Sequence, residues 1–312
     1  MLRLAATLVL LAAACRQPSA DARARRAMAE GKAQLALQTP AGKQAALAAY
    51  GEALRLWEDA GDLARQAEAA GMLGEVHDNL GDMAQAAAWS ARALELYRRA
   101  GDRHGEAMAL GWVGIAEVHL GQVAAALPRF REALAIARAA GDREAEGYAL
   151  LNLAFGLARS ETPSAVAEAI AANEAALPVY EALRDPENLA VVHNNLGRAA
   201  LLLGDAARAL HHHRAALEIR TREDLRLHVP WSYLNLAEVH LDLLDEPAIA
   251  LDLDRKALDL AIASGNRLVE PYARHGLGAA LLALDRPAEA LPQLEQALAG
   301  WATQGPDRAP AT

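Results

Sequence analysis

Residues 101–142 read GDRHGEAMALGWVGIAEVHLGQVAAALPRFREALAIARAAGD. The stretch opens and closes on Gly-Asp, and the same pair stands forty residues earlier at Gly61-Asp62. Glycine supplies the left-handed residue that ends a helix, and aspartate caps the first turn of the next helix. The sequence therefore predicts one helical hairpin between successive pairs. Small insertions shift the later turns, which fall at Arg184-Asp185, Gly265-Asn266 and Gly305-Pro306.

Small residues recur in three columns when the intervals are aligned. The first holds Ala46, Ala86, Ala126, Ala169, Ala209, Ala250 and Ala290. The second, seven residues later, holds Ala53, Ala93, Ala133, Ala176, Ala216, Ala257 and Ala297. The third lies upstream, on the first helix of each hairpin, and holds Gly74, Gly114, Ala154, Gly197, Ala237 and Gly278. Alanines seven apart share one helix stripe, and small residues let helices approach closely. Each hairpin must therefore stack on a neighbour to cover its apolar stripe.

The composition favours helices throughout. The chain is 53% apolar but only 4% aromatic, and its commonest apolar residues, alanine and leucine, are strong helix formers. We therefore expect an all-α chain with seven helix-turn-helix units. Their predicted bounds are about 22–62, 63–102, 103–142, 143–185, 186–225, 226–266 and 267–304, followed by a tail at 305–312.

The second unit carries the most specific motif: Leu73-Gly74, Gly81, Ala86 and Ala93 stand at the spacing of the tetratricopeptide repeat family. The units have about forty residues instead of ~34, and Gly-Asp replaces the usual terminal proline. In both features the chain resembles the long-unit subfamily found in kinesin light chains, in sensor regions of large bacterial transcription activators and in CHAT-associated proteins. The resemblance implies a right-handed α-solenoid over residues 22–302, with first helices lining a groove for a protein or extended peptide.

The N-terminus has the layout of a bacterial export signal. Residues 1–14 carry one charge, at Arg3, and then an apolar run that is too short to span a bilayer. Cys15 follows directly and is the only cysteine, a placement that resembles the lipobox of bacterial lipoproteins. We expect a membrane-anchored periplasmic lipoprotein, tethered by residues 15–21. Ala12-Ala13-Ala14 would also serve as an ordinary cleavage site and leave a soluble secreted protein.

Asparagine recurs at one position of the predicted groove in three consecutive units, as Asn152, Asn195 and Asn235. An amide carries both a donor and an acceptor, so a ladder of amides could pair with the backbone of an extended peptide. The alternative is that each amide bonds to a neighbouring helix or to water.

Large side chains are expected around the asparagines on the same surface. Aromatic residues and arginines are typical anchors of partner contacts, although Tyr148 and Trp231 could equally pack between adjacent first helices. The earlier units add Glu68, Glu75 and Asp78, which favour a basic segment in the partner. The candidate anchors are Tyr148, Arg159, Arg198, Trp231 and Tyr272.

Several function classes are disfavoured. The net charge of −9 and the lack of a concentrated basic face argue against nucleic acid. No phosphate-binding loop or nucleophile motif occurs, so we expect neither an enzyme nor a cofactor. His211, His212 and His213 are consecutive on a predicted helix and point in three directions, so we expect no metal site.

These observations predict an interaction scaffold at the periplasmic face of a membrane, in envelope assembly or secretion. The alternative is the regulatory front half of a longer enzyme, such as a CHAT-type protease, or of a signalling regulator. The last hairpin motivates it, because its stripe of Leu291, Leu294 and Leu298 has no following cap. That stripe would form a homodimer, bind the tail or meet another domain.

Overall fold

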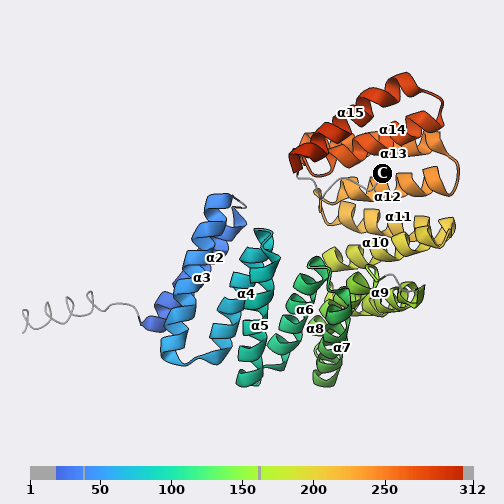
Figure 1. Ribbon diagram of the computed structural model, residues 1–312. Coiled ribbons are helices and arrows are strands. Elements are labelled where there is room, and N and C mark those ends of the chain that lie inside the picture. The colour runs from blue at the N-terminus through green and yellow to red at the C-terminus, as the bar shows by residue number, and fades with distance from the viewer. Residues whose placement is uncertain (1–18, 38, 161–162, 305–312) are drawn as a thin grey trace, which may run out of the picture. The chain divides into compact units, whose positions relative to one another are not determined.

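The structure is a computed structural model that describes residues 19–37, 39–160 and 163–304. Within these ranges it contains fourteen α-helices and no strand. The chain divides into two compact units, of residues 1–161 and 162–312 (Figure 1). The prediction of an all-α solenoid of repeats is confirmed. The predicted signal at 1–14, the tether up to Gln17-Pro18, Cys15 and the tail at 305–312 lie outside the described residues.

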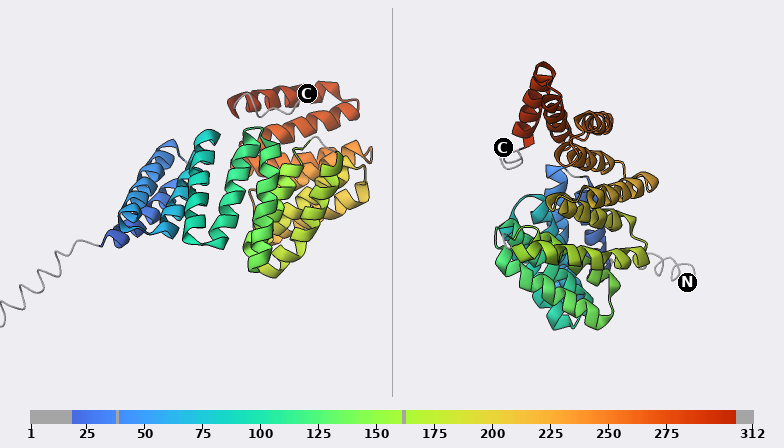
Figure 2. Two further views of the ribbon diagram at one scale, coloured as in Figure 1. Left: turned by 60° about the horizontal axis from the view of Figure 1, so that its bottom comes forward. Right: turned by 90° about the vertical axis from the view of Figure 1, so that its right-hand side faces the viewer.

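Unit 1 consists of three hairpins and one further helix. In each hairpin the two helices pack side by side, and each second helix also packs on the first helix of the next pair (Figures 1 and 2). The final helix, α8, packs on α7 and α6. The helices are α2 (Ala20–Ala36), α3 (Pro40–Ala60), α4 (Leu63–Asn79), α5 (Met83–Ala100), α6 (Arg103–His119), α7 (Val123–Ala140) and α8 (Arg143–Leu157).

Unit 2 opens on a single helix, α9, which packs on α10, and continues as three hairpins. The division of the chain falls between α8 and α9, inside the predicted unit 143–185. The helices are α9 (Pro163–Leu183), α10 (Pro186–Leu202), α11 (Ala206–Arg222), α12 (Val229–Asp242), α13 (Pro247–Ser264), α14 (Glu270–Ala283) and α15 (Pro287–Gln304).

The Gly-Asp turns have the expected geometry. Gly61, Gly101 and Gly141 are left-handed, with φ of 70°, 72° and 65°, and each following aspartate accepts a hydrogen bond from a backbone N–H three residues on. Arg184 holds the equivalent place with φ of 54° although it has a side chain. The turn therefore depends on the backbone conformation and the aspartate cap, and glycine is not obligatory there.

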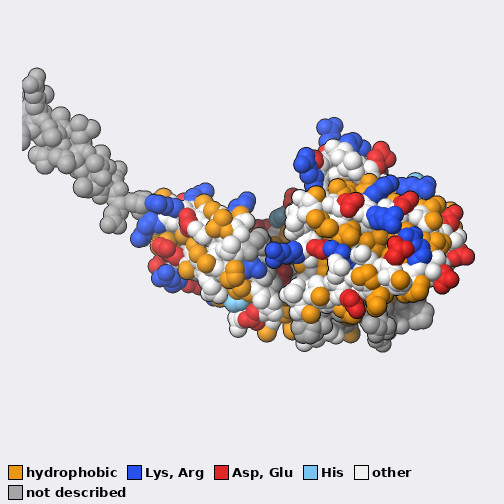
Figure 3. All heavy atoms as spheres, turned by 90° about the horizontal axis from the view of Figure 1, so that it is seen from above, with side chains coloured by type: hydrophobic (Ala, Val, Ile, Leu, Met, Phe, Trp, Pro, Cys, Tyr) orange, Lys and Arg blue, Asp and Glu red, His pale blue; other side chains and the backbone are white. Residues whose placement is uncertain are grey.

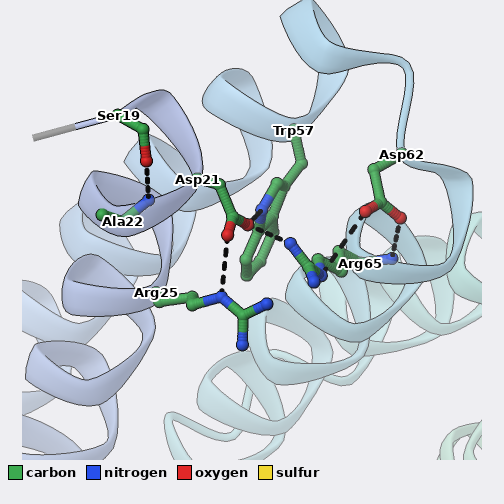
Figure 4. Close-up of polar contacts among 7 residues, drawn as sticks. All are labelled: Ser19, Asp21, Ala22, Arg25, Trp57, Asp62 and Arg65. Carbon is green, nitrogen blue, oxygen red and sulfur yellow. Dashed lines mark hydrogen bonds and ion pairs between the residues drawn. The ribbon is translucent and has the colours of Figure 1, made fainter.

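The first hairpin is fixed at its open end by one carboxylate. Asp21 accepts hydrogen bonds from Arg25 (2.9 Å) and Trp57 (3.3 Å), and it also pairs with Arg65, so α2, α3 and α4 meet there (Figure 4). These bonds hold the pKa of Asp21 below its usual value, with the bond from Arg25 contributing most. Ser19 caps α2 through the N–H of Ala22. The helix consequently begins at Ala20, two residues before the predicted start of the repeats.

The alanine columns lie in the core. All seven members of the second column are 0% exposed, and those of the first are between 0% and 8% exposed. Side chains no larger than a methyl group at these places let each second helix lie close to its neighbours. Burial of both columns is what the stacking of hairpins requires.

The glycines of the third column face one interior position on the second helix of the same hairpin. A Cβ added at Gly114 would overlap the ring of Phe130, and one added at Gly197 would lie 2.6 Å from the ring of His213. Phe130 and His213 are both 0% exposed. Each missing side chain on the first helix thus makes room for a large one on the second.

This interior position changes character along the chain. In unit 1 it holds Tyr50, Ser90 and Phe130, and in unit 2 it holds Asn173, His213 and Asp254, which are buried and polar, and then Leu294. The pKa of His213 falls to about 4, because burial and then the nearby positive charge of Arg198 disfavour the imidazolium. At three of its four places in unit 2, this position is therefore polar and buried.

Asp254 is the most strongly perturbed acid described. It is 2% exposed, and its carboxyl group lies where a side chain on Gly276 would stand, 2.6 Å from the place of that Cβ. Burial, and then the negative charge of Glu238, raise the pKa of Asp254 from 3.8 to about 8. The carboxyl group is therefore largely protonated in the folded chain at neutral pH.

We expect Asp254→Asn to weaken the pH dependence of stability. In the wild type the unfolded chain loses the Asp254 proton near pH 4 and the folded chain keeps it to about pH 8. The free energy of unfolding should therefore fall as pH rises through this window, by up to about 1.4 kcal/mol per pH unit. Urea unfolding at pH 4.5, 6 and 7.5 gives the free energy of unfolding of both proteins. The value for the variant minus that for the wild type should increase at each step in pH. A constant difference between the two proteins would contradict the assignment.

Candidate functional site

Unit 1 has a hollow on the face formed by its first helices. Its volume is ≈ 240 Å³, and α4, α6 and α8 form most of its walls, with the second helix α5 at one side. The larger lining side chains are Met72, Glu75, Asp78, Trp112, Ile115 and Tyr148. The hollow therefore combines apolar, aromatic and acidic groups in one place.

Two glycines seat the aromatic rings of this hollow. A Cβ on Gly71 would lie 2.6 Å from the Trp112 ring, and one on Gly111 would lie 2.5 Å from the Tyr148 ring. Each ring therefore rests against the backbone of the preceding first helix. Trp112 also meets Tyr97, with ring centroids 6.5 Å apart. The rings are half-buried, so each keeps part of its surface exposed.

The acidic groups give the hollow a negative potential. Glu75 and Asp78 are one turn apart on α4 and are exposed. Partial desolvation, and then the negative charge of Asp78, raise the pKa of Glu75, while Lys32 acts in the opposite direction. Burial raises the pKa of Tyr148 to about 12, and the charges of Asp78 and Glu75 act in the same direction. A cation would relieve this potential.

The three asparagines have inter-helix roles. Within unit 2, Asn195 donates to Asn173 Oδ1 (3.2 Å), and Asn235 donates to Asn194 on the neighbouring first helix. Asn152 belongs to unit 1, where it is 7% exposed and packs over Gly111 beside Tyr148. The bonds of Asn195 and Asn235 match the alternative in which an amide bonds to a neighbouring helix. Both residues are half-buried, so part of each amide remains accessible.

Trp231 and Tyr272 lie in a ring cluster of unit 2. Their centroids are 5.2 Å apart, and Tyr272 meets the edge of Trp301 at 5.5 Å. His275 adds a further contact with Trp301 at 5.6 Å. The cluster joins α12, α14 and α15, so Trp231 and Tyr272 contribute to packing between helices while remaining half-buried.

The two predicted arginines are exposed. Arg159 lies beyond the end of α8, with its guanidinium 4.3 Å from the centroid of Phe155. Arg198 lies on α10 in unit 2, where its charge lowers the pKa of Glu238 against the stronger effect of burial. Of the predicted anchors, Tyr148 alone lines the unit 1 hollow.

Met72 and Trp112 also line the hollow, but the sequence pattern indicates them less clearly as site residues. Met72 and Trp112 occupy the asparagine position in earlier units, so a search for repeated amides passes over them. The glycines that directly precede them, Gly71 and Gly111, could have indicated the hollow, because a glycine inside a helix often marks a close approach.

The three consecutive histidines point in different directions, as expected, and His213 occupies the interior position of its hairpin. His213 is buried, His211 is exposed, and His212 is half-buried with its Nδ1 3.1 Å from Nδ1 of His193. Burial lowers the pKa of both paired imidazoles, that of His212 to about 4. Within the described ranges no three His, Cys, Asp or Glu side chains come together in a way that could hold a metal ion.

On the surface shown in Figure 3, acidic and basic side chains alternate with small groups of apolar ones. None of the helices in the described part of the chain has the length and apolar character to cross a bilayer.

Comparison with family models identifies the repeats. One model described as tetratricopeptide repeat matches residues 164–222 and 228–302, and a second model of the same description matches residues 67–99. No curated protein sequence matches this chain significantly.

Solved structures share the fold at low sequence identity. The apo form of RapI is 13% identical with a TM-score of 0.70, covering 90% of this chain and 99% of its own. A STAND protein with a tetratricopeptide repeat sensor from Pyrococcus horikoshii is 15% identical with a TM-score of 0.68, covering 89% and 48%. The Rap conjugation gene regulator of the plasmid pLS20, solved with the Phr* peptide, is 15% identical with a TM-score of 0.58, covering 90% and 76%. The chain thus contains tetratricopeptide repeats, at residues 67–99, 164–222 and 228–302.

Proposed function

We propose that this chain is a non-catalytic scaffold that holds a protein or an extended peptide against the first-helix faces of its units. The hollow of unit 1 carries the proposal, because half-exposed aromatic rings beside two acidic side chains are suited to anchoring a partner. The pLS20 regulator, of similar fold, was solved with a peptide bound. The forty-residue spacing supports placing the chain in the long-unit subfamily.

Selection from a random dodecapeptide library on the immobilised chain (residues 16–312) should enrich peptides that bind in solution. We expect the folded variant Asn195→Ala/Asn235→Ala to bind them about tenfold more weakly, since each lost amide bond contributes about 1 kcal/mol or less. The control, Gln85→Ala/Gln296→Ala, removes two exposed amides from second helices. Fluorescence anisotropy measures the affinities, and circular dichroism verifies folding.

Two outcomes would count against these assignments. Enrichment no higher than on an unrelated helical protein would contradict peptide binding. Equal affinity for the wild type and the folded double variant would remove Asn195 and Asn235 from the binding surface and leave the scaffold itself in place.

The proposal includes export and attachment to a membrane through Cys15, with a role in envelope assembly or secretion. The sequence of residues 1–15 supports it. In a Gram-negative host, the full chain should incorporate radioactive palmitate and fractionate with membranes, and Cys15→Ser should lose the label. A labelled Cys15→Ser variant, or an unlabelled wild type found soluble in the periplasm, would contradict the anchor. The second result would favour ordinary cleavage after Ala14.

A second candidate is a regulatory region within a longer signalling protein or enzyme. The chain covers 48% of the STAND protein, in which similar repeats form a sensor. On α15, Leu291 and Leu298 are 59% and 60% exposed. Leu294 lies inward against Gly278, so the predicted stripe of three leucines reduces to two. The exposed pair could meet another domain or a second copy of the chain.

For the homodimer, sedimentation velocity should show a sedimentation coefficient that rises with protein concentration between about 1 and 100 µM, the range of weak association. Leu291→Gln/Leu298→Gln should abolish the rise, because it removes the exposed apolar contact. A wild type that stays monomeric over the whole range would contradict the dimer.

A further inference from the structure

We infer that the hollow of unit 1 is a pocket for the side chain of an arginine in the bound segment. The inference deepens the proposed scaffold function and rests on it.

The size of the hollow limits what it can hold. Pockets that enclose drug-sized ligands have volumes of about 300–1,000 Å³, and this one has ≈ 240 Å³. It therefore suits a single long side chain whose backbone passes outside. An extended segment lying across α4, α6 and α8 could place one residue in it.

The walls favour a cation with an apolar stem. Trp112 and Tyr148 offer aromatic surface, and aromatic faces attract cationic groups. Met72 adds a polarisable thioether that adapts to the methylene stem. Gly71 and Gly111 let both rings lie against the helix backbone, which limits how far the rings can retreat.

The carboxylates of Glu75 and Asp78 supply the charge. Three buried acidic side chains on α6 and α8 are paired: Glu106 and Glu146 each contact two arginines, and Glu117 contacts Arg129. Within the described ranges, neither Glu75 nor Asp78 forms an ion pair or a side-chain hydrogen bond, and Lys32 acts on Glu75 only at longer range. These two carboxylates are therefore available to an incoming cation.

Arginine fits this set better than lysine. Its planar guanidinium stacks on aromatic rings and presents five donors in a fixed fork, so it can contact a ring and both carboxylates together. The lysine ammonium is compact and strongly hydrated, and it would gain less from the rings. We therefore expect the order arginine, then lysine, then neutral side chains.

The probe for this pocket is N-acetyl-L-arginine N-methylamide, titrated into the chain of residues 16–312. We expect roughly millimolar binding, seen as shifts of the Trp112 indole and Gly71 amide signals in ¹H–¹⁵N NMR spectra. The matching lysine compound should bind more weakly, and the citrulline compound, which keeps the shape but loses the charge, should bind about tenfold more weakly.

Variants locate the site. Glu75→Gln/Asp78→Asn should weaken binding of the arginine probe about tenfold. Glu52→Gln/Glu95→Gln makes the same change in net charge at exposed positions on α3 and α5, and it should leave the affinity within about twofold, since screening weakens distant charges. Each substitution replaces a carboxylate by an amide of nearly the same volume, so all variants should fold as the wild type does.

Three results would overturn the inference: absence of shifts at the hollow, equal affinity for the citrulline compound, or unchanged affinity in Glu75→Gln/Asp78→Asn. The library selection shows whether the arginine pocket alone is wrong or the scaffold function is wrong as well. Enriched peptides without basic residues, together with no binding of the arginine probe, would leave the scaffold standing without this pocket. Probe binding without any enriched peptide would support the pocket and contradict the scaffold.

Discussion

The structure depends on close contact between a glycine on the first helix of a hairpin and one interior side chain on its second helix. At Gly114 and Gly197 the missing side chain leaves room for the ring of Phe130 or His213. Protein interiors tolerate neither overlap nor voids well, so this pairing sets the distance between the two helices. The alanine columns then set the distance to the next hairpin.

The candidate site relies on the same kind of contact three residues earlier on the first helices. Gly71 and Gly111 lie on first helices like the glycines of the third column, but the rings they receive come from the following first helix and line the hollow. The packing that stacks the repeats thus also presents aromatic surface to a partner. Unit 2 differs, because its asparagines bond to each other across helices and its aromatics cluster near α15.

Much of the fold could be predicted from the sequence, because the determinants repeat. Glycine, aspartate and alanine at a period of forty define turns, caps and buried stripes, and the helices follow. The site was less predictable, since it depends on which residues differ between repeats. A ladder of asparagines was the visible pattern, yet Asn195 and Asn235 use their amides inside unit 2. No other unit has a tryptophan at the position of Trp112, and periodicity gives no reason to single it out.

A double-mutant cycle between Gly114 and Phe130 tests the pairing most directly. Gly114→Ala places a methyl group against the Phe130 ring, and Phe130→Leu shortens that ring to a smaller side chain. Gly51→Ala, on α3 with open space around it, corrects for helix propensity. We expect Gly114→Ala to destabilise the wild type more than the Phe130→Leu variant, with a coupling of about 1 kcal/mol or more in urea unfolding. Effects that add to within about 0.5 kcal/mol would show that the two residues do not constrain each other, and would contradict the account.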